Sequence, residues 1–257
     1  MALNGPVVRV AAVGDLHCGK NSQGALQPLF ARVAEAADVL VLCGDLTDYG
    51  LPEEAKILVR ELAGTVKIPV IGVFGNHDYE SGHADEVKAI LGDGGVRILD
   101  GDFVEIGGVG FAGVKGFAGG FGDRALQSWG EPVLKRFVRE AVEEALKLEA
   151  ALARIQPPRV AVLHYSPVRS TVDQEPPEVV PFLGSSRLEE PINRYGAVAA
   201  VHGHAHHGVP EGRTSTGVPV YNVSLPLLRA VLGGRPPFRL LEIPVPQEAA
   251  VPAASTS

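Results

Sequence analysis

The sequence has few cysteines, no excess of basic charge and no long apolar run, and each shortage excludes a class of protein. Only Cys18 and Cys43 occur among 257 residues, so a disulfide-stapled scaffold is excluded. The formal net charge is −7, without a long block of either sign. A protein built mainly to hold nucleic acid is expected to have a basic face, so we do not expect a nucleic-acid partner. No apolar stretch is long enough to span a bilayer, and no membrane partner is expected.

The first residues lack the basic start and the apolar stretch of a signal peptide. Both cysteines follow or lie within apolar stretches, where reduced cysteines commonly pack as small core residues. We therefore expect a reducing, cytoplasmic setting.

The first third of the chain alternates between buried strands and helices. Short, β-branched runs predict strands over 7–13, 39–43 and 68–74, and apolar residues at helical spacing predict helices over 27–37 and 52–62. Strands that alternate with helices indicate βαβ units and a largely parallel sheet. The fold class is therefore α/β.

The pattern changes after this region. Short strands at 96–99, 103–106 and 109–114, separated by turn residues, predict hairpins. The run "GFAGGFG" at 116–122 is rich in glycine and is expected to be a mobile loop. The clearest helix covers 132–155 and has an apolar stripe. Further strands are expected at 160–163, 198–201, 218–223 and 238–243. We predict one domain over 1–243 and a frayed tail rich in Pro, Ala and Ser over 244–257.

Five of the apolar strands end on polar side chains that suit a metal. Ligands bind beyond the carboxyl ends of strands in open α/β sheets, so these side chains are expected to converge in one crevice. Oxygen ligands and imidazoles gathered there would need cations, and two divalent metals that share a carboxylate satisfy them. The five sets are Asp15 with His17, Asp45 with Asp48, Asn76 with His77, His164, and His204 with His206.

Four glycines precede these polar residues, at the points where the chain must turn sharply out of a strand: Gly14, Gly44, Gly75 and Gly203. A residue that adopts positive φ, or that lacks a Cβ near the metal, fits such a position. A single Gly-Asp pair carries no information, but five polar sets in this order, each after an apolar run, are a specific signal.

The complete series resembles the motifs of the calcineurin-like metallophosphoesterases. It consists of Asp15-Leu16-His17, Gly44-Asp45-Leu46-Thr47-Asp48, Gly75-Asn76-His77-Asp78, His164 and Gly203-His204-Ala205-His206, and it covers about 8–223. The resemblance, to a small, single-domain bacterial-type member, implies a four-layer α/β-β/α sandwich of two mixed sheets flanked by helices. The short strands after 95 and the closing strands at 218–223 and 238–243 would suit its second sheet.

The resemblance also implies roles for individual residues. Asp15, His17 and His206 would hold one metal; Asn76, His164 and His204 would hold the other; Asp45 would bridge the two. His77 would be the catalytic histidine, and the Asp48 carboxylate would orient it. The metals are two divalent or transition ions; Mn, Fe, Zn and Ni all suit these ligands.

The implied reaction is hydrolysis of a phosphate ester, more often a diester, of a small molecule. A metal-activated hydroxide would attack phosphorus in line, Asn76 would help to neutralise the equatorial oxygens, and His77 would protonate the leaving group. Tyr49 stands where protein phosphatases have a phosphate-binding Arg, which disfavours a protein substrate, and Asp48 stands where purple acid phosphatases have a metal-binding Tyr. The alternatives are a metal-dependent nuclease and a catalytically silent metal-binding scaffold; the scaffold-type relative lacks the histidine that is present here as His77.

Some nearby residues keep two interpretations. We expect His202 to pack behind the ligands, and His207 and His83 to face solvent. Cys18 is a poor ligand, because a soft thiolate does not match this oxygen and nitrogen set. The loops 115–129 and 166–187 lie between strand ends, where substrate-selecting loops usually lie. Phe117, Phe121, Arg124 and Trp129 could cover a base or leaving group, and Arg169 and Arg187 could meet a second phosphate; ordinary loop packing is the other interpretation.

Overall fold

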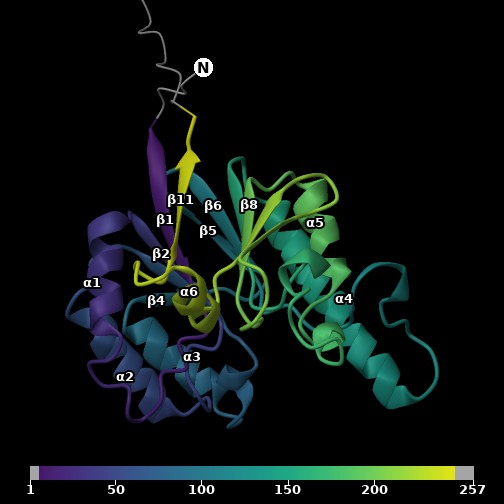
Figure 1. Cartoon of the computed structure of the whole chain (residues 1–257), viewed down its shortest axis with the longest axis horizontal. Coiled ribbons are helices and arrows are strands. Elements are labelled where there is room, and N and C mark those ends of the chain that lie inside the picture. Colours follow the sequence, from purple (N-terminus) through teal and green to yellow (C-terminus); the bar gives the residue numbers. More distant parts are fainter. Residues whose placement is uncertain (1–5, 247–257) are drawn as a thin grey trace, which may run out of the picture.

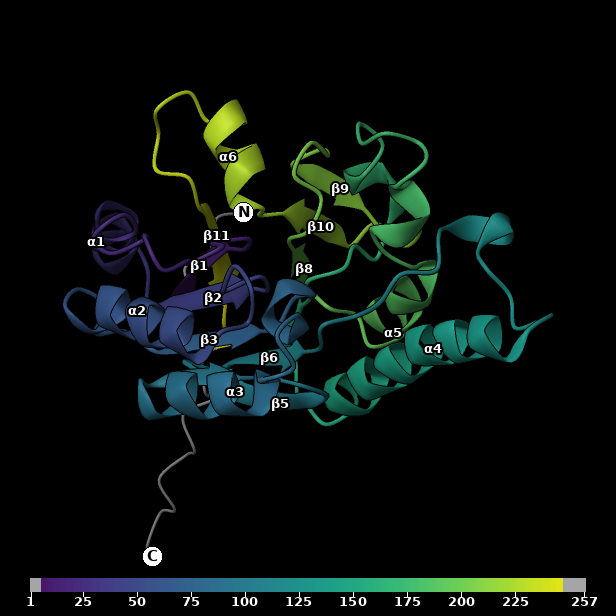
Figure 2. The ribbon, with the colours of Figure 1, turned by 90° about the horizontal axis from the view of Figure 1, so that it is seen from below.

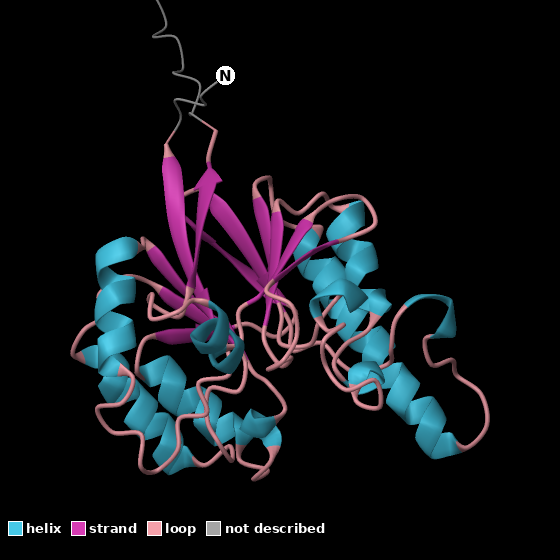
Figure 3. Cartoon of the chain, viewed as in Figure 1, coloured by secondary structure: helices cyan, strands magenta, loops and turns pink. Residues whose placement is uncertain are grey.

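The first apolar run forms strand β1 (Val7–Val13) in the computed structural model, which describes residues 6–246. Val10 and Ala12 of this strand face the core between two sheets, whereas Ala11 and Val13 face a layer of helices. Successive side chains of a strand point to opposite faces, so a continuous apolar run needs cover on both. The four layers of the fold supply that cover (Figure 3).

The first sheet has the strand order β11-β1-β2-β3-β4 in the described part of the chain. Strands β1 to β4 are parallel, and β11 pairs with β1 in the antiparallel direction. Apart from β1, its strands are β2 (Val39–Cys43), β3 (Val70–Val73), β4 (Val96–Ile98) and β11 (Arg239–Pro244).

The second sheet has the order β5-β6-β7-β8-β10-β9 within residues 6–246. Strands β6, β7, β8 and β10 are parallel, while β5 and β9 run antiparallel at the two edges. The strands are β5 (Asp102–Ile106), β6 (Val109–Gly113), β7 (Arg159–Val162), β8 (Ala199–His202), β9 (Glu211–Arg213) and β10 (Pro219–Asn222).

Helices cover the outer face of each sheet (Figure 1). On the first sheet, α1 (Gln27–Ala36), α2 (Pro52–Ala63) and α3 (Ala84–Asp93) bury residues such as Phe30, Leu58 and Leu91 against the strands. On the second, α4 (Pro132–Leu152) and α5 (Glu189–Arg194) pack Leu148 and Ile192. Helix α6 (Leu225–Val231) contributes Leu228 to the core between the sheets. This arrangement is the α/β-β/α sandwich that we expected.

The two sheets end at a common edge, which Figure 2 views from below. The backbone just beyond β1 joins the backbone just beyond β10: Gly14 N donates to Val223 O at 2.9 Å, and Leu225 N donates to Gly14 O at 3.0 Å. These bonds form a parallel bridge between Gly14 and Ser224. The carboxyl ends of parallel strands from both sheets therefore meet along one line.

Two expectations about strand pairing are wrong. The strands at 96–99 and 103–106 do not form a hairpin, because β4 completes the first sheet and β5 begins the second. The turn residues between them carry the chain from one sheet to the other, and of these three short strands β5 and β6 form a hairpin. Strand β11 also belongs to the first sheet rather than the second, since it pairs with β1.

The sequence did not predict α3, α6 or β9. Helix α3 is weakly amphipathic, because only Val87 and Leu91 are buried, and β9 is a three-residue strand. The glycine-rich segment 116–122 is held by backbone bonds to 181–186, which its composition did not indicate. Strand β11 runs to Pro244, one residue into the predicted tail, and 247–257 lie outside the described residues. Within the described range, no helix combines the length and the apolar character that crossing a membrane requires.

Candidate metal centre

The turns that follow the strands hold a strained backbone at four of the expected ligands. Among residues 6–246, the non-glycine residues with positive φ are Asp15 (55°), His17 (43°), Asp45 (48°) and His204 (70°). Such a conformation costs free energy for a residue with a Cβ, and it persists where the surrounding structure enforces it, often at functional sites. The strain is thus concentrated on residues that were expected to hold metal.

Two glycines leave space for the carboxylates. A Cβ on Gly75 would lie 2.1 Å from Asp45 Oδ1, and a Cβ on Gly203 would lie 2.4 Å from Asp15 Oδ2. Both distances are far below a van der Waals contact, so only glycine allows these oxygens to occupy their positions. Glycine is therefore required at both positions by the close approach of an expected ligand.

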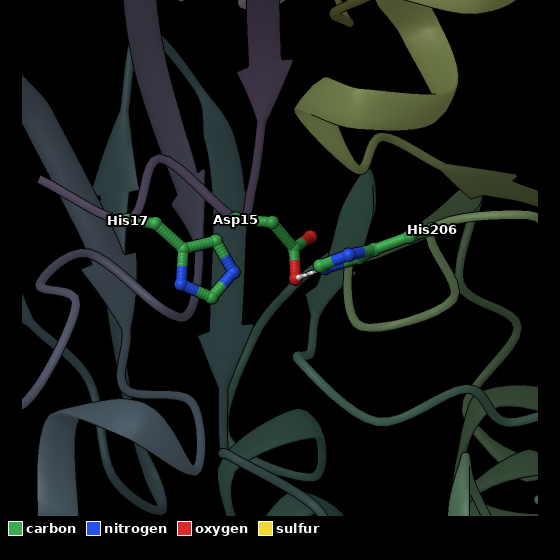
Figure 4. A group of neighbouring side chains, drawn as sticks. All are labelled: Asp15, His17 and His206. Carbon is green, nitrogen blue, oxygen red and sulfur yellow. Dashed lines mark hydrogen bonds and ion pairs between the residues drawn. The ribbon is translucent and has the colours of Figure 1, made fainter.

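Asp15, His17 and His206 form the first cluster of possible ligands (Figure 4). One potential ligand atom from each residue lies within 4.8 Å of those of the other two. Asp15 follows β1 and is buried, and its Oδ1 lies 3.0 Å from His206 Nε2. The His204 backbone N–H also donates to the Asp15 carboxylate, at 3.0 Å, which fixes the loop after β8 against the end of β1.

Asp45, His164 and His204 form the second cluster, within the same 4.8 Å limit. Asn76 joins it, because its Oδ1 lies 3.0 Å from His164 Nε2. His164 is fully buried, and its Nδ1 lies 2.9 Å from the Cys43 carbonyl oxygen. That contact with a carbonyl places the ring proton on Nδ1 and leaves Nε2 as the ligand atom.

Asp45 lies between the two clusters. Its Oδ2 is 3.4 Å from His164 Nε2 in one cluster and 3.9 Å from His17 Nε2 in the other. Its other oxygen, Oδ1, accepts a hydrogen bond of 2.9 Å from the His77 backbone N–H. Asp45 Oδ2 therefore faces one histidine of each cluster.

The chemistry of the donors fits metal ions. His17 Nε2 is buried and lacks a hydrogen-bond partner among the described residues, although a buried polar atom normally has one. Burial, followed by the charge on His164, lowers the pKa of His204 to about 3, and burial also lowers the pKa of His17. Both rings are therefore neutral at pH 7, the form in which imidazole binds a metal.

His77 lies beside the first cluster, with its ring centroid 4.6 Å from that of His17. Its Nδ1 donates to the backbone carbonyl of Asp48 at 2.7 Å. The Asp48 carboxylate instead lies 3.5 Å from His17 Nδ1. The Asp48 carboxylate, His17 and His77 each offer an atom within 4.8 Å of the other two, but the hydrogen bond from His77 is accepted by the main chain of Asp48, because the tight turn after Asp45 presents that carbonyl to the ring.

Asp78 organises the turns around Asp45, a role that sequence reasoning missed. This fully buried carboxylate accepts hydrogen bonds from the backbone N–H groups of Leu46, Thr47 and Gly75, and from the Thr47 hydroxyl, at 2.6 to 3.2 Å. Burial, with the charge of Asp45, raises the pKa of Asp78 to about 6, and the hydrogen bonds oppose that rise. In the sequence, the feature that pointed to Asp78 was its position directly after Asn76 and His77.

The remaining candidates lie where the sequence indicated. His202 is buried behind the ligands, with Nε2 2.8 Å from Thr171 Oγ1, and His207 and His83 are exposed. Cys18 is buried and belongs to none of the clusters found in residues 6–246; burial raises its pKa to about 12. The Ser185 side chain caps the short helix Ser186–Leu188 by accepting a hydrogen bond from Arg187 N.

Comparison with known proteins agrees with this geometry. The model of the family described as calcineurin-like phosphoesterase matches residues 8–208. No curated protein matches the chain. The solved structure of a phosphopantetheinyl hydrolase from Mycobacterium tuberculosis is 18% identical, with a TM-score of 0.65, over 97% of this chain and 100% of that one.

Two other solved structures share the fold. A putative 5′-nucleotidase from Staphylococcus aureus has a TM-score of 0.53 at 14% identity, over 84% of this chain and 48% of that one. GAP50, described as the anchor in the inner membrane complex of Plasmodium, has a TM-score of 0.53 at 12% identity, over 86% of this chain and 72% of its own. The family model covers most of the chain, and the expected ligands gather at one edge of the expected fold. The chain therefore belongs to the calcineurin-like phosphoesterase family.

Proposed function

We propose that the protein is a dinuclear metal-dependent hydrolase that cleaves a phosphate ester, preferentially a diester, of a small molecule. The observation that carries this proposal is the position of the Asp45 carboxylate, which faces a histidine of each of the two clusters. Asp15, His17 and His206 would hold one ion, and Asn76, His164 and His204 the other. When bound, the ions supply Lewis acidity, which activates water and neutralises phosphoryl charge.

Asn76 would position the phosphate. Its Oδ1 is directed at His164, so its amide NH₂ is the group that remains to donate a hydrogen bond to a phosphoryl oxygen. A fixed donor at that place stabilises charge that develops on the oxygens during in-line displacement.

His77 would protonate the leaving alkoxide from Nε2, because Nδ1 is bonded to the Asp48 carbonyl. Burial lowers the pKa of His77, but the Asp48 carbonyl and the carboxylates of Asp45, Glu80 and Asp48 outweigh burial and raise it overall. A raised pKa keeps more of the ring protonated near neutral pH, as a general acid requires.

The similar structures support small organic phosphates as the substrate class, since one is described as a phosphopantetheinyl hydrolase and another as a putative 5′-nucleotidase. Manganese is our first choice of ion, because nitrogen and oxygen ligands accept it, together with Fe, Zn and Ni. A cytoplasmic setting is part of the proposal, and two buried, unpaired cysteines support it. The similarity to GAP50, described as an anchor, favours a metal-binding scaffold as the second candidate, and the presence of His77 argues against it.

The test compares wild type with His77→Gln in the presence of Mn²⁺, on a p-nitrophenyl diester and on an alkyl diester. We expect kcat on the alkyl diester to fall about 10²–10⁴-fold, and kcat on the p-nitrophenyl diester to fall much less, because nitrophenolate leaves without a proton. His83→Gln, at an exposed histidine, is the matched control. Absence of hydrolysis by metal-loaded wild type would favour the scaffold, and equal losses on both esters would remove the acid role.

A further inference from the structure

A cavity of about 390 Å³ lies beside the metal centre, between the loop that precedes α4 and the segment that precedes α5. We call it the Phe182 pocket; Gly119–Leu126 residues line one side and Val180–Phe182 residues the other, with Phe137 and Arg169 completing it. The volume falls within the range of small-molecule sites, which is roughly 300–1,000 Å³. None of the residues proposed above for catalysis or metal binding lines it.

The walls of the Phe182 pocket are fixed by main-chain hydrogen bonds. Gly119 N donates to Pro181 O at 3.0 Å, and Gly120 N donates to Gly184 O at 2.9 Å. The guanidinium of Arg187 donates to Leu126 O at 3.0 Å and holds the far end of the loop. The two segments therefore form a single preformed wall, which lowers the entropic cost of binding a ligand.

The wall of the pocket contacts the second metal cluster. The ring of His204 donates from Nε2 to the backbone carbonyl of Phe182, at 3.4 Å. Ala205, the residue after His204, packs in one apolar cluster with Val180, which lines the pocket, and with Leu183, which follows Phe182. Phe182 therefore lies both against a ligand of the second cluster and in the lining of the pocket, so a substituent on a phosphate held at that cluster would be close to the pocket.

The lining combines aromatic rings with positive charge. Phe121, Phe137 and Phe182 are apolar walls, and the Phe182 side chain is 57% exposed. Arg124 makes no hydrogen bond or ion pair with the residues between 6 and 246, and Arg169 is paired through Nε with Asp173, which leaves its terminal nitrogens available. Two arginines and three aromatic side chains in one lining suit a flat ring that carries an anion.

A second hollow, of about 430 Å³, lies on the other side of the centre, beside His17. It is lined by the carboxylates of Asp48 and Glu54, with Lys20 as its cation. These carboxylates would repel an anionic group, whereas the Phe182 pocket has no carboxylate in its lining. An anionic, aromatic substituent is therefore expected in the Phe182 pocket and not beside His17.

We propose that the Phe182 pocket binds an aromatic, nucleoside-like substituent of the substrate that carries a second phosphate or a similar anion. The proposal rests on the proposed phosphoesterase function and specifies its substrate class. Phe121, Phe137 and Phe182 cover the ring, and Arg124 and Arg169 bind the second anion.

The experiment measures calorimetric binding of thymidine 3′,5′-bisphosphate and thymidine 5′-monophosphate to the full, Mn²⁺-loaded chain. Wild type should bind the bisphosphate about tenfold more tightly, because a charge-assisted hydrogen bond contributes on the order of that factor. Arg124→Met and Arg169→Met should each reduce this ratio toward one. Phe182→Ala should weaken both ligands, since its exposed side chain can be removed without opening the core. Arg60→Met, at an exposed arginine on α2, should leave both affinities unchanged.

Hydrolysis of the p-nitrophenyl 5′-esters of the same two nucleotides separates the two proposals. Equal affinities for the two nucleotides, or an unchanged ratio in both arginine variants, would overturn the pocket assignment even if both esters are hydrolysed. If wild type binds the bisphosphate more tightly than the monophosphate but hydrolyses neither ester, the pocket assignment is supported and the proposed phosphoesterase function is contradicted.

Discussion

The backbone carbonyl of Asp48 accepts a hydrogen bond of 2.7 Å from His77 Nδ1, while the carboxylate of the same residue lies 3.5 Å from His17 Nδ1. One residue thus positions two histidines through different groups. Its main chain fixes the tautomer of the expected general acid, and its side chain orients an expected metal ligand.

A substitution at Asp48 should therefore affect metal binding more than proton transfer. Asp48→Asn keeps the carbonyl but removes the negative charge beside His17, so we expect metal affinity to fall about 10–100-fold. At saturating metal, kcat should stay within a few-fold of wild type. Glu80→Gln, which alters a carboxylate 3.5 Å from His77 Nδ1, is the control and should leave metal affinity unchanged. A large loss of kcat in Asp48→Asn at full metal loading would show that the carboxylate acts on His77 after all.

Gly75→Ala should displace the shared carboxylate. The new methyl group would lie 2.1 Å from Asp45 Oδ1 and 2.4 Å from Asp45 N, so Asp45 must move. We expect bound metal to fall below one ion per chain and stability to drop by about 1–3 kcal/mol. Gly92→Ala, in α3 with nothing within 4 Å of the added methyl, should keep full metal content and be slightly more stable. Metal analysis and urea unfolding measure both effects; normal metal content in Gly75→Ala would contradict the geometry.

Asp78→Asn should destabilise the fold, even without metal. Each oxygen of Asp78 accepts two hydrogen bonds, so an amide NH₂ in either orientation would face at least one backbone N–H donor. We expect a loss of about 2–4 kcal/mol in the free energy of unfolding. Asp93→Asn, at an exposed position, should change it by less than about 0.5 kcal/mol. Urea unfolding of the metal-free proteins makes the comparison, and similar midpoints for both variants would refute the proposed role of Asp78.

Both cysteines should resist alkylation in the native protein. Cys18 and Cys43 are fully buried, and burial raises the pKa of Cys18 to about 12, so little thiolate forms at pH 8. Iodoacetamide should add to neither residue in native protein and to both in guanidinium chloride. Mass spectrometry counts the adducts, and rapid native labelling of Cys18 would mean that the turn after His17 opens.

The sequence predicted that the expected ligands gather at one edge, because each of them follows an apolar run whose end the fold must place there. The runs at Val39–Cys43 and Val70–Val73 read as strands without any tertiary information. Which atom of Asp48 contacts which histidine was not predictable, since a motif specifies a residue type and the turn decides the orientation.

The sequence also did not predict how segments far apart in the chain pair with one another. A turn such as Asp100-Gly101-Asp102 can close a hairpin or carry the chain into the next sheet, and only packing between the sheets decides. Packing also decides the contact between the Phe182 carbonyl and His204, which are 22 positions apart in the sequence.

The number of metal ions bound per chain tests the central claim most directly. Elemental analysis after loading with Mn²⁺ and removal of free metal should give two ions per chain for wild type, and clearly less than two for Asp45→Ala, which lacks the carboxylate between the clusters. One ion or none in wild type, or two retained in Asp45→Ala, would contradict a shared dinuclear centre.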